Sequence, residues 1–393
     1  MSVMLNHMQF VTGLAFGNGT TAQLLQFINC LVLGLGLFSI GLRYFHPIIA
    51  YIALALFIAN DSVVLHSTAA LVDLGAAFFS TFAIYAFLNW LEESKREWIL
   101  MAGLMAGFST AVKLNTAFLM GVLLATVFIY ALYRKEFRAF WGFGACFLLT
   151  AGPWYLRNWI MIGNPVFPMY PEIFGYTFWS KDEVNSLFGF LEVQTAHERS
   201  FWAFLQMPYN MAFRMMAYIM EARYTSWLFY LLPFTVWALW VSSISRWLFF
   251  FALAHAVFWF SGVHNMRHFF PALPLYCIFI ASGVLFFKKF WPELWHRFSP
   301  MVLKGIFLFA VLRSSHYAQW IITGTPLYSY HKIEGRGPFP FTDAAREKYL
   351  MKNAPAYEAI KYLNEINGPD YRVYVTYSEN LVTMWMEPIL GIG

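Results

Sequence analysis

Long apolar stretches constrain this chain more than any other feature of its sequence. The longest of them match the ~20 residues that a helix needs to cross a membrane. About ten are present, at residues 22–42, 47–60, 69–90, 97–113, 115–133, 139–156, 227–243, 247–263, 268–287 and 302–321. The 393-residue chain is 60% hydrophobic and 12% charged, whereas soluble domains carry about 25% charged residues. The sequence therefore predicts an α-helical polytopic membrane protein.

The basic residues set the orientation of the predicted spans. They gather in alternate loops, at Arg43, Lys95, Arg96, Arg134, Lys135, Arg138, Arg246, Lys288, Lys289, Arg297 and Lys304. Since positive loops stay in the cytoplasm, the N-terminus, the loop 157–226 and the tail after about residue 322 are expected to face outward. A net charge of +5 that arises from such loops indicates membrane topology, and no nucleic-acid partner is expected.

Two segments outside the spans have a secondary-structure pattern of their own. In residues 201–220 the apolar residues recur at helical spacing, which predicts an amphipathic helix on the outer membrane face. Residues 354–367 predict a helix, and residues 371–377 alternate like a strand, as at the start of a small α/β domain. The predicted division is a transmembrane domain over 1–321 and an extracytoplasmic tail over 322–393.

Two charged residues stand at the outer ends of predicted spans. Asp73 lies about one turn into the third span, and Lys113 ends the fourth. Because a charge in lipid is costly, each is a hypothesis for function. The alternatives are that Asp73 complements the positive end of its helix and that Lys113 extends to the interface. Gly103 and Gly107 form a small-residue face in the fourth span, which favours close helix packing.

The stretch AGPWYLRNWIMIGNPVFPMY, residues 151–170, ends the sixth predicted span. Pro153 is expected to break the helix, which leaves Arg157 and Asn158 on a stiff outer lip. Arginine binds phosphate through two parallel hydrogen bonds, and Asn158 adds neutral donors. The alternative is an arginine that extends to the interface beside an asparagine that caps the broken helix.

A second group of polar residues lies in residues 262–276. His264, Arg267 and His268 gather at an outer span end, where positive charge is otherwise sparse, and this favours an anion site. No metal site is predicted, because no acid lies between the two histidines on a helix. His255 is expected to be a core residue, and His66 an ordinary loop residue like Asp61.

Four segments in order resemble a known family. They are LVDLGAAFF (71–79), WILMAGLMAGFSTAVKLN (98–115), GPWYLRNWIMIGNPVFP (152–168) and RHFFPALPL (267–275). The order resembles bacterial GT-C membrane glycosyltransferases, the family 39-like proteins related to protein O-mannosyltransferases and aminoarabinose transferases. The resemblance covers most of residues 10–287, and the signature around Pro153 is its most specific part.

The resemblance implies a GT-C-like bundle in the bacterial inner membrane with its active face outward. Such an enzyme transfers a sugar from a polyprenyl-phosphate-linked donor to a glycan, lipid or protein acceptor. Asp73 matches an acid that helps build the catalytic site. Lys113, Arg157 and Arg267 match residues that would hold the lipid phosphate, with Asn158 and His268 beside them. A divalent cation is left open as a cofactor.

The resemblance also implies an acid that this sequence lacks. The family carries a first span and an acidic first outer loop ahead of the region matched by residues 10–40, whereas no Asp or Glu precedes Asp61 here. A truncated or inactive member is therefore expected. Two alternatives stay open, a transporter or flippase of a lipid-linked sugar and a non-catalytic membrane scaffold. The first would use the same outward cations without transfer chemistry.

Overall fold

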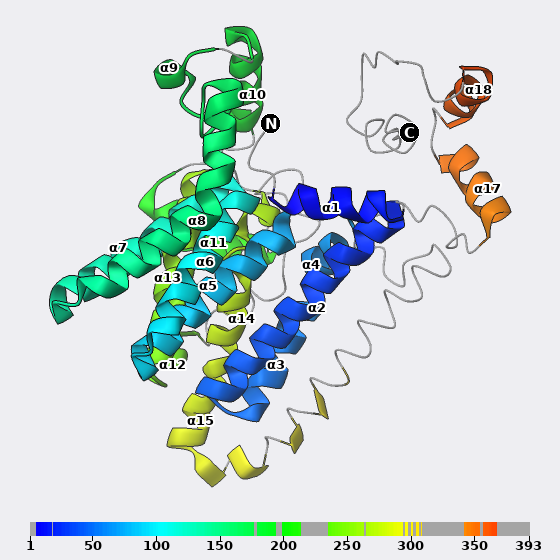
Figure 1. Ribbon diagram of the computed structural model, residues 1–393. Helices are drawn as coiled ribbons and strands as arrows, with labels where there is room; N and C mark the ends of the chain where they lie inside the picture. The colour runs from blue at the N-terminus through cyan, green and yellow to red at the C-terminus, as the bar shows by residue number, and fades with distance from the viewer. Residues whose placement is uncertain are drawn as a thin grey trace. The chain divides into compact units, whose positions relative to one another are not determined.

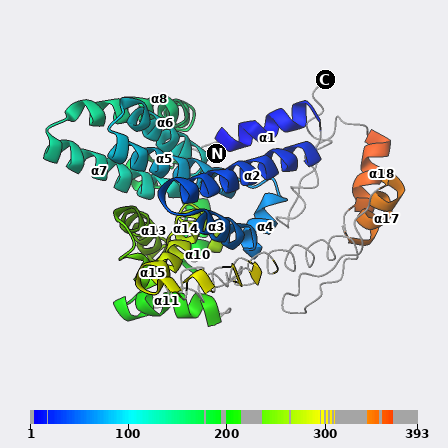
Figure 2. The same cartoon turned by 90° about the horizontal axis from the view of Figure 1, so that it is seen from below.

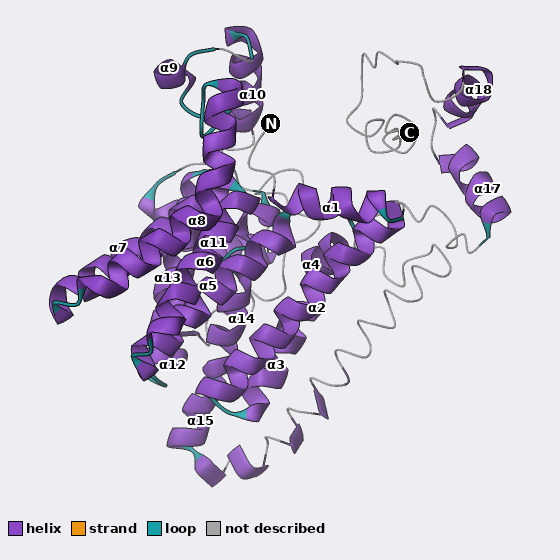
Figure 3. Ribbon diagram, in the orientation of Figure 1, coloured by secondary structure: helices purple, strands orange, loops and turns teal. Residues whose placement is uncertain are grey.

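The chain folds into two compact units, Met1–Phe307 and Leu308–Gly393. The computed structural model describes residues 5–17, 19–176, 179–193, 199–213, 235–262, 265–293, 295–297, 300–301, 304–305, 308, 342–353 and 357–367. Within these ranges all regular structure is helical (Figure 3). The boundary predicted at residue 321 lies outside the described residues.

The first unit is a bundle of helices (Figure 1). Its elements are α1 Leu5–Ala15, α2 Gly19–Tyr44, α3 Pro47–Ile58, α4 Asp61–Ser67, α5 Asp73–Glu93, α6 Arg96–Val112, η1 Leu114–Thr116, α7 Ala117–Arg134, α8 Phe137–Ile162, α9 Pro171–Phe174, α10 Lys181–Val193, α11 Phe201–Phe213, α12 Thr235–Ala238, α13 Ser243–Ser261, η4 Met266–Phe269, α14 Leu273–Ser282 and α15 Val284–Phe290. Side by side in the bundle lie α1 with α2, α2 with α3, and α5 with α6, which in turn packs on α8 (Figures 1 and 2).

Several of these helices are long and apolar enough to cross a membrane. Among the described residues five qualify, namely Gly19–Tyr44, Asp73–Glu93, Leu114–Arg134, Ser243–Ser261 and Leu273–Phe290. The protein is therefore an integral membrane protein of the α-helical polytopic class, as predicted. The ninth span begins at Leu273 and not at residue 268. The ten-span count stays a prediction, since nearly half of 227–243 and most of 302–321 lie outside the described residues.

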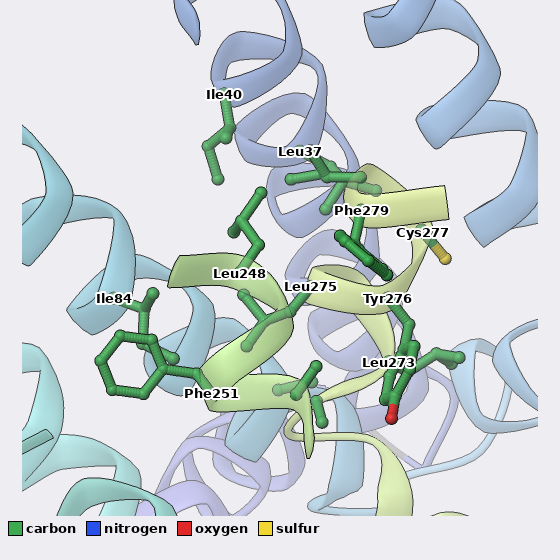
Figure 4. Close-up of a cluster of buried hydrophobic side chains, with 14 of the residues drawn as sticks. Leu37, Ile40, Ile84, Leu248, Phe251, Leu273, Leu275, Tyr276, Cys277 and Phe279 are labelled. Carbon is green, nitrogen blue, oxygen red and sulfur yellow. The ribbon is translucent and has the colours of Figure 1, made fainter. Parts of the chain in front are cut away.

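An apolar core joins α2, α5, α13 and α14 (Figure 4). Leu37, Ile84, Leu248, Phe251 and Phe279 are all almost fully buried there. Helices that meet through such side chains stay at fixed positions, because an interior packed this densely has few alternative arrangements. The core thereby fixes the relative positions of the segments at the helix ends.

Each end of α5 carries a carboxylate that pairs with a cation. At its last turn Glu93 pairs with Arg43 of α2 and lies 2.8 Å from the Lys95 ammonium. Asp73 begins the helix at the other end, and α5 is 21 residues long. A helix of that length is about 30 Å long, close to the thickness of a bilayer's hydrocarbon core. Asp73 and Glu93 therefore belong to opposite ends of one membrane span.

The predicted helix break at Pro153 is wrong, because α8 continues through it to Ile162. Contacts with α6 hold the helix on both sides of the proline. Before it, the Thr150 hydroxyl donates to the Leu104 carbonyl at 3.1 Å, and after it, the Tyr155 hydroxyl donates to the Thr110 carbonyl at 3.2 Å. A proline in a membrane helix is tolerated where neighbouring helices provide such support.

The turn after α8 has the geometry that glycine and asparagine favour. Gly163 ends the helix with a φ of 77°, in the left-handed region. The Asn164 side chain accepts a hydrogen bond from the Val166 amide at 2.9 Å and donates one to the Met169 carbonyl at 2.8 Å. The segment that follows α8 is therefore a closed turn fixed by its own asparagine.

The small-residue face of α6 packs directly on α8. Gly103 lies against the backbone of Phe143, and Gly107 lies against Phe147 and Thr150. There is no room for a methyl group at either glycine, since a Cβ would collide with backbone oxygens of α8. The predicted role of the two glycines in close helix packing is confirmed.

Replacing Gly103 by alanine is expected to lower the free energy of unfolding by about 1–3 kcal/mol, the usual cost of overpacking. The matched control is Gly144→Ala on α8, where a Cβ meets open space. That change is expected to raise stability by about 0.5–1 kcal/mol, because alanine is the better helix former. Thermal unfolding in detergent measures both, and a Gly103→Ala protein as stable as Gly144→Ala would contradict the packing.

The helix predicted in residues 201–220 is present over its described part. It is α11, in which Phe201, Trp202, Leu205 and Tyr209 are exposed and Met207 is buried. Its position on the outer membrane face stays a prediction.

The second unit contains two described helices, α17 Asp343–Asn353 and α18 Tyr357–Asn367. The predicted tail helix is thus confirmed over 357–367, and Lys361 of α18 pairs with Glu347 of α17. The strand predicted at 371–377 lies outside the described residues.

Candidate functional site

A buried ion pair joins the start of α5 to the end of α6. The Lys113 ammonium donates a hydrogen bond to Asp73 Oδ1. The Asp73 side chain is 3% exposed and that of Lys113 is 20% exposed. Because α5 and α6 are antiparallel and joined by a short turn, the first turn of one meets the last turn of the other. The sequence indicated Asp73 and Lys113 separately as candidate functional residues, and the structure places them in contact.

The local backbone explains why Lys113 reaches Asp73. Lys113 caps α6 in an extended conformation, with φ −152° and ψ 127°, and the short helix η1 starts directly after it. The lysine therefore leaves the helical path at this point. Thr116 fixes the turn, since its hydroxyl donates to the Lys113 carbonyl at 2.8 Å.

Arg267 and His268 are brought to the same place by the short helix η4. Asn265 caps this helix, and its side chain accepts a hydrogen bond from the Arg267 amide at 3.1 Å. The Arg267 guanidinium acts electrostatically on the Asp73 carboxylate, and the His268 ring interacts with Lys113, Arg267 and Asp73. Four of the six predicted site residues thus form one cluster.

Two residues outside the predicted set hold this cluster together through a single carbonyl. The Nε2 atom of His255, on α13, donates to the His268 carbonyl at 2.9 Å. Asn115, on η1, donates to the same oxygen from Nδ2 at 3.4 Å. This shared acceptor ties α13, η1 and η4 to each other. His255 is a core residue, as predicted, but it also fixes the segment that carries Arg267 and His268.

His66 is a further residue of the cluster, and its predicted placement in an ordinary loop is wrong. It lies on α4, is 2% exposed, and acts electrostatically on Asp73. Its Nδ1 atom donates to the Ser62 carbonyl at 2.8 Å, and its ring meets that of Phe270 edge-on at 4.8 Å between centroids. The loop pattern of the sequence does not reveal this, because burial here comes from the distant η4 segment.

Several donor and acceptor atoms of the cluster have no hydrogen-bond partner among the described residues. Among the described residues, Arg267 Nε, Asn115 Oδ1 and His255 Nδ1 are buried without a hydrogen-bond partner. An unused guanidinium donor beside a lysine is suited to an anion, because charge-assisted bonds to phosphate oxygens are short and strong. Within the described part of the chain, no group of three or more His, Cys, Asp or Glu side chains is placed to hold a metal ion.

The other two predicted site residues, Arg157 and Asn158, lie in the last turns of α8. Asn158 is 2% exposed, and Arg157 Nη1 donates to its Oδ1 at 3.4 Å. Neither Arg157 nor Asn158 takes part in the hydrogen bonds described above for Asp73, Lys113 and His268. The alternative in which Asn158 caps a broken helix is wrong, because α8 continues for four residues beyond it, to Ile162.

Burial, and then the charges of Lys113 and Arg267, lower the pKa of His268 from 6.5 to about 3. The folded protein therefore keeps this ring neutral at a pH where the unfolded chain protonates it. Stability conferred by the neutral ring is present above pH 6.5 and is lost as the pH falls below it. Lowering the pH from about 8 to about 5 is expected to cost about 1–2 kcal/mol of unfolding free energy from this residue.

Thermal unfolding in detergent as a function of pH measures this effect. The matched variant is His268→Gln, which keeps a polar side chain but cannot titrate in this range. Its stability is expected to fall less than that of the wild type between the two pH values. Parallel curves for the two proteins would show that His268 titrates normally in the folded state.

Comparison with known proteins gives one family match. The model described as dolichyl-phosphate-mannose-protein mannosyltransferase matches residues 19–161. That region contains Asp73, Lys113, Arg157 and Asn158, whereas Arg267 and His268 lie beyond it. No curated protein sequence matches the chain.

Two crystal structures of ArnT from Cupriavidus metallidurans are similar to this chain. The structure bound to undecaprenyl phosphate has 15% identity and a TM-score of 0.46, and the match covers 93% of this chain and 62% of ArnT. For the apo structure the identity is 16%, the TM-score 0.45 and the coverage 74% and 50%. The chain thus spans less than two thirds of the length of ArnT. The resemblance to GT-C glycosyltransferases that its sequence carries is confirmed, by the family model, over residues 19–161.

Proposed function

We propose that this chain is a membrane glycosyltransferase, or part of one, that uses a polyprenyl-phosphate-linked sugar at the outer face of a bacterial inner membrane. The observation that carries the proposal is the buried Asp73–Lys113 ion pair with Arg267 and His268 around it. Charged side chains within a membrane protein are costly, and those that are present usually serve a function. The family match over residues 19–161 supports the same chemistry.

In the proposed reaction an acceptor hydroxyl attacks the anomeric carbon of the sugar. The bond from that carbon to the phosphate oxygen breaks, the hydroxyl proton passes to water, and the lipid phosphate leaves with an added negative charge. Cations fixed in advance at the place where this charge develops lower the barrier. Arg267, with its unpaired Nε, and Lys113 are the groups that would hold the phosphate.

Asp73 has a positioning role in this proposal. Its carboxylate is engaged by Lys113, so it fixes the lysine ammonium beside Arg267. The neutral ring of His268 adds a polar group without a further positive charge. Arg157 and Asn158, at the outer end of α8, are proposed as a second contact of the lipid phosphate. The acceptor is a glycan, a lipid or a protein.

The test is a transfer assay with the 393-residue chain in proteoliposomes. Undecaprenyl phosphate carrying radiolabelled mannose, glucose, galactose or aminoarabinose is the donor, and membrane extract supplies the acceptors. Label is expected to pass from at least one lipid to an acceptor, and Lys113→Gln and Arg267→Ala are expected to lose it. Movement of the labelled lipid across the bilayer without transfer would favour the flippase instead, and binding of none of the lipids would overturn the proposal.

A further inference from the structure

Four amide side chains lie on α1 and α2, two on each helix. We call Asn6, Gln9, Gln26 and Asn29 the amide cluster. Asn29 Nδ2 donates to Gln9 Oε1 at 3.0 Å and to Gln26 Oε1 at 3.3 Å, and Gln9 Nε2 donates to Asn29 Oδ1 at 3.4 Å. The two helices pack side by side (Figures 1 and 2).

The amide cluster lies next to the site of Asp73. The Asn6 side chain packs against Gly75 of α5, so closely that a Cβ on Gly75 would collide with Asn6 Oδ1. Gly75 is in the same first turn of α5 as Asp73. A ligand that contacts Asn6 is therefore adjacent to the cluster that the proposed function assigns to the lipid phosphate.

Two members of the cluster are buried without using their donors. Asn6 is 2% exposed and Gln26 is fully buried, yet Asn6 Nδ2 and Gln26 Nε2 have no hydrogen-bond partner among the described residues. Amides do join membrane helices, and the Gln9–Asn29 pair does so here. Asn6 and Gln26 go beyond this, because a buried donor left unpaired costs free energy that an apolar residue would avoid.

The chemistry of the cluster selects a neutral ligand. Each amide offers both a carbonyl acceptor and an NH₂ donor, and none carries a charge. A hydroxyl group is likewise both donor and acceptor, so neighbouring amides match neighbouring hydroxyls. Gln9 and Asn29 are half-buried and lie beside the buried Asn6 and Gln26, so a ligand would reach the cluster from their side.

We infer that the amide cluster binds sugar hydroxyl groups, either those of the lipid-linked donor or those of a glycan acceptor. This inference rests on the proposed function for its neighbour, the phosphate-binding cluster. It assigns the sugar to α1, α2 and the first turn of α5, and the phosphate to Asp73, Lys113 and Arg267.

The test variant is Gln26→Leu, which replaces the amide by an apolar side chain of similar size. Its matched control is Gln23→Leu, the same change one turn away on the exposed face of α2. Dissociation constants are measured in nanodiscs for undecaprenyl phosphate, for the same lipid carrying mannose, glucose, galactose or aminoarabinose, and for a free oligosaccharide mixture. Thermal unfolding without ligand is recorded for each protein.

Gln26→Leu is expected to bind undecaprenyl phosphate as the wild type does and to be at least as stable. Its dissociation constant for a sugar-bearing ligand is expected to rise about tenfold, the effect of one lost hydrogen bond to a well-fitted hydroxyl. Weaker binding of the lipid-linked sugar assigns the cluster to the donor, and weaker binding of the free glycan alone assigns it to the acceptor. Asn6→Leu is expected to behave in the same way.

Equal sugar affinities for Gln26→Leu and Gln23→Leu would overturn the inference. So would a Gln26→Leu protein of lower thermal stability whose sugar binding is intact, since the amide would then be structural. If the wild type fails to bind undecaprenyl phosphate, the proposed function is wrong. The free glycan then decides the inference alone: binding weakened in Gln26→Leu supports it, and equal or absent binding overturns it.

Discussion

Replacing Arg267 by alanine is expected to lower the transfer rate by about 10²–10³-fold, the usual loss when one fixed donor to a developing negative charge is removed. The Arg267 guanidinium lies on η4 beside the Asp73–Lys113 pair, and its Nε donor has no partner among the described residues. The change would therefore remove the proposed contact with the ligand, and it breaks no hydrogen bond of Nε to the described part of the protein.

Initial rates with a lipid-linked sugar measure this loss, and thermal unfolding shows whether the variant is folded. Arg267→Lys is expected to recover only part of the rate, because an ammonium keeps the charge but not the planar pair of donors. The control is Arg246→Ala, an exposed arginine at the other end of α13. Equal rates for Arg267→Ala and Arg246→Ala would remove Arg267 from the site.

Replacing Lys113 by glutamine is expected to lower the free energy of unfolding by about 3–5 kcal/mol, because the Asp73 carboxylate is then buried without its partner. Asp73 is 3% exposed, so water cannot replace the lost ammonium. The double variant Asp73→Asn with Lys113→Gln is expected to regain most of this stability, since two neutral amides can bond to each other. Both proteins are expected to lose transfer activity.

A double-mutant cycle by chemical or thermal unfolding measures the coupling between the two residues. The matched control is Lys95→Gln at the opposite end of α5, where Lys95 is 66% exposed and pairs with Glu93 at 2.8 Å. An exposed pair is worth about 0–1 kcal/mol, so the control is expected to change little. A double variant no more stable than Lys113→Gln alone would show that the burial of Asp73 is not the source of the loss.

Features that depend on neighbouring residues could be predicted from the sequence. The apolar runs predicted the five helices that are long and apolar enough to cross a membrane, and the glycines of α6 predicted its close packing on α8. Asp73 and Lys113 could be identified as candidate site residues from local sequence as well. A charge at the end of an apolar run is unusual whatever the helix packs against. The turn at Gly163 and Asn164 follows from residue types that favour turns.

The features that the sequence did not reveal depend on contacts between distant segments. Pro153 stays within α8 because α6 supports the turns on both sides of it. His66 is buried because Phe270 covers it, about 200 residues further along the chain. Asn115 and His255 have their roles only because a carbonyl on a third element lies within reach of both. No pattern of neighbouring residues could indicate that Asn115 and His255 bond to the same carbonyl.

The shared carbonyl of His268 also determines which segments can be exchanged between related chains without disturbing the fold. Donors on α13 and η1 both bond to one carbonyl oxygen of η4, so the positions of these three elements depend on each other. This holds although more than 100 residues of sequence separate Asn115 from His255 and His268. A chimera that swaps α13 alone would keep its apolar surface and insert normally, yet it would leave η4 misaligned. Swaps of donor or acceptor specificity between such proteins should therefore move η1, α13 and η4 together.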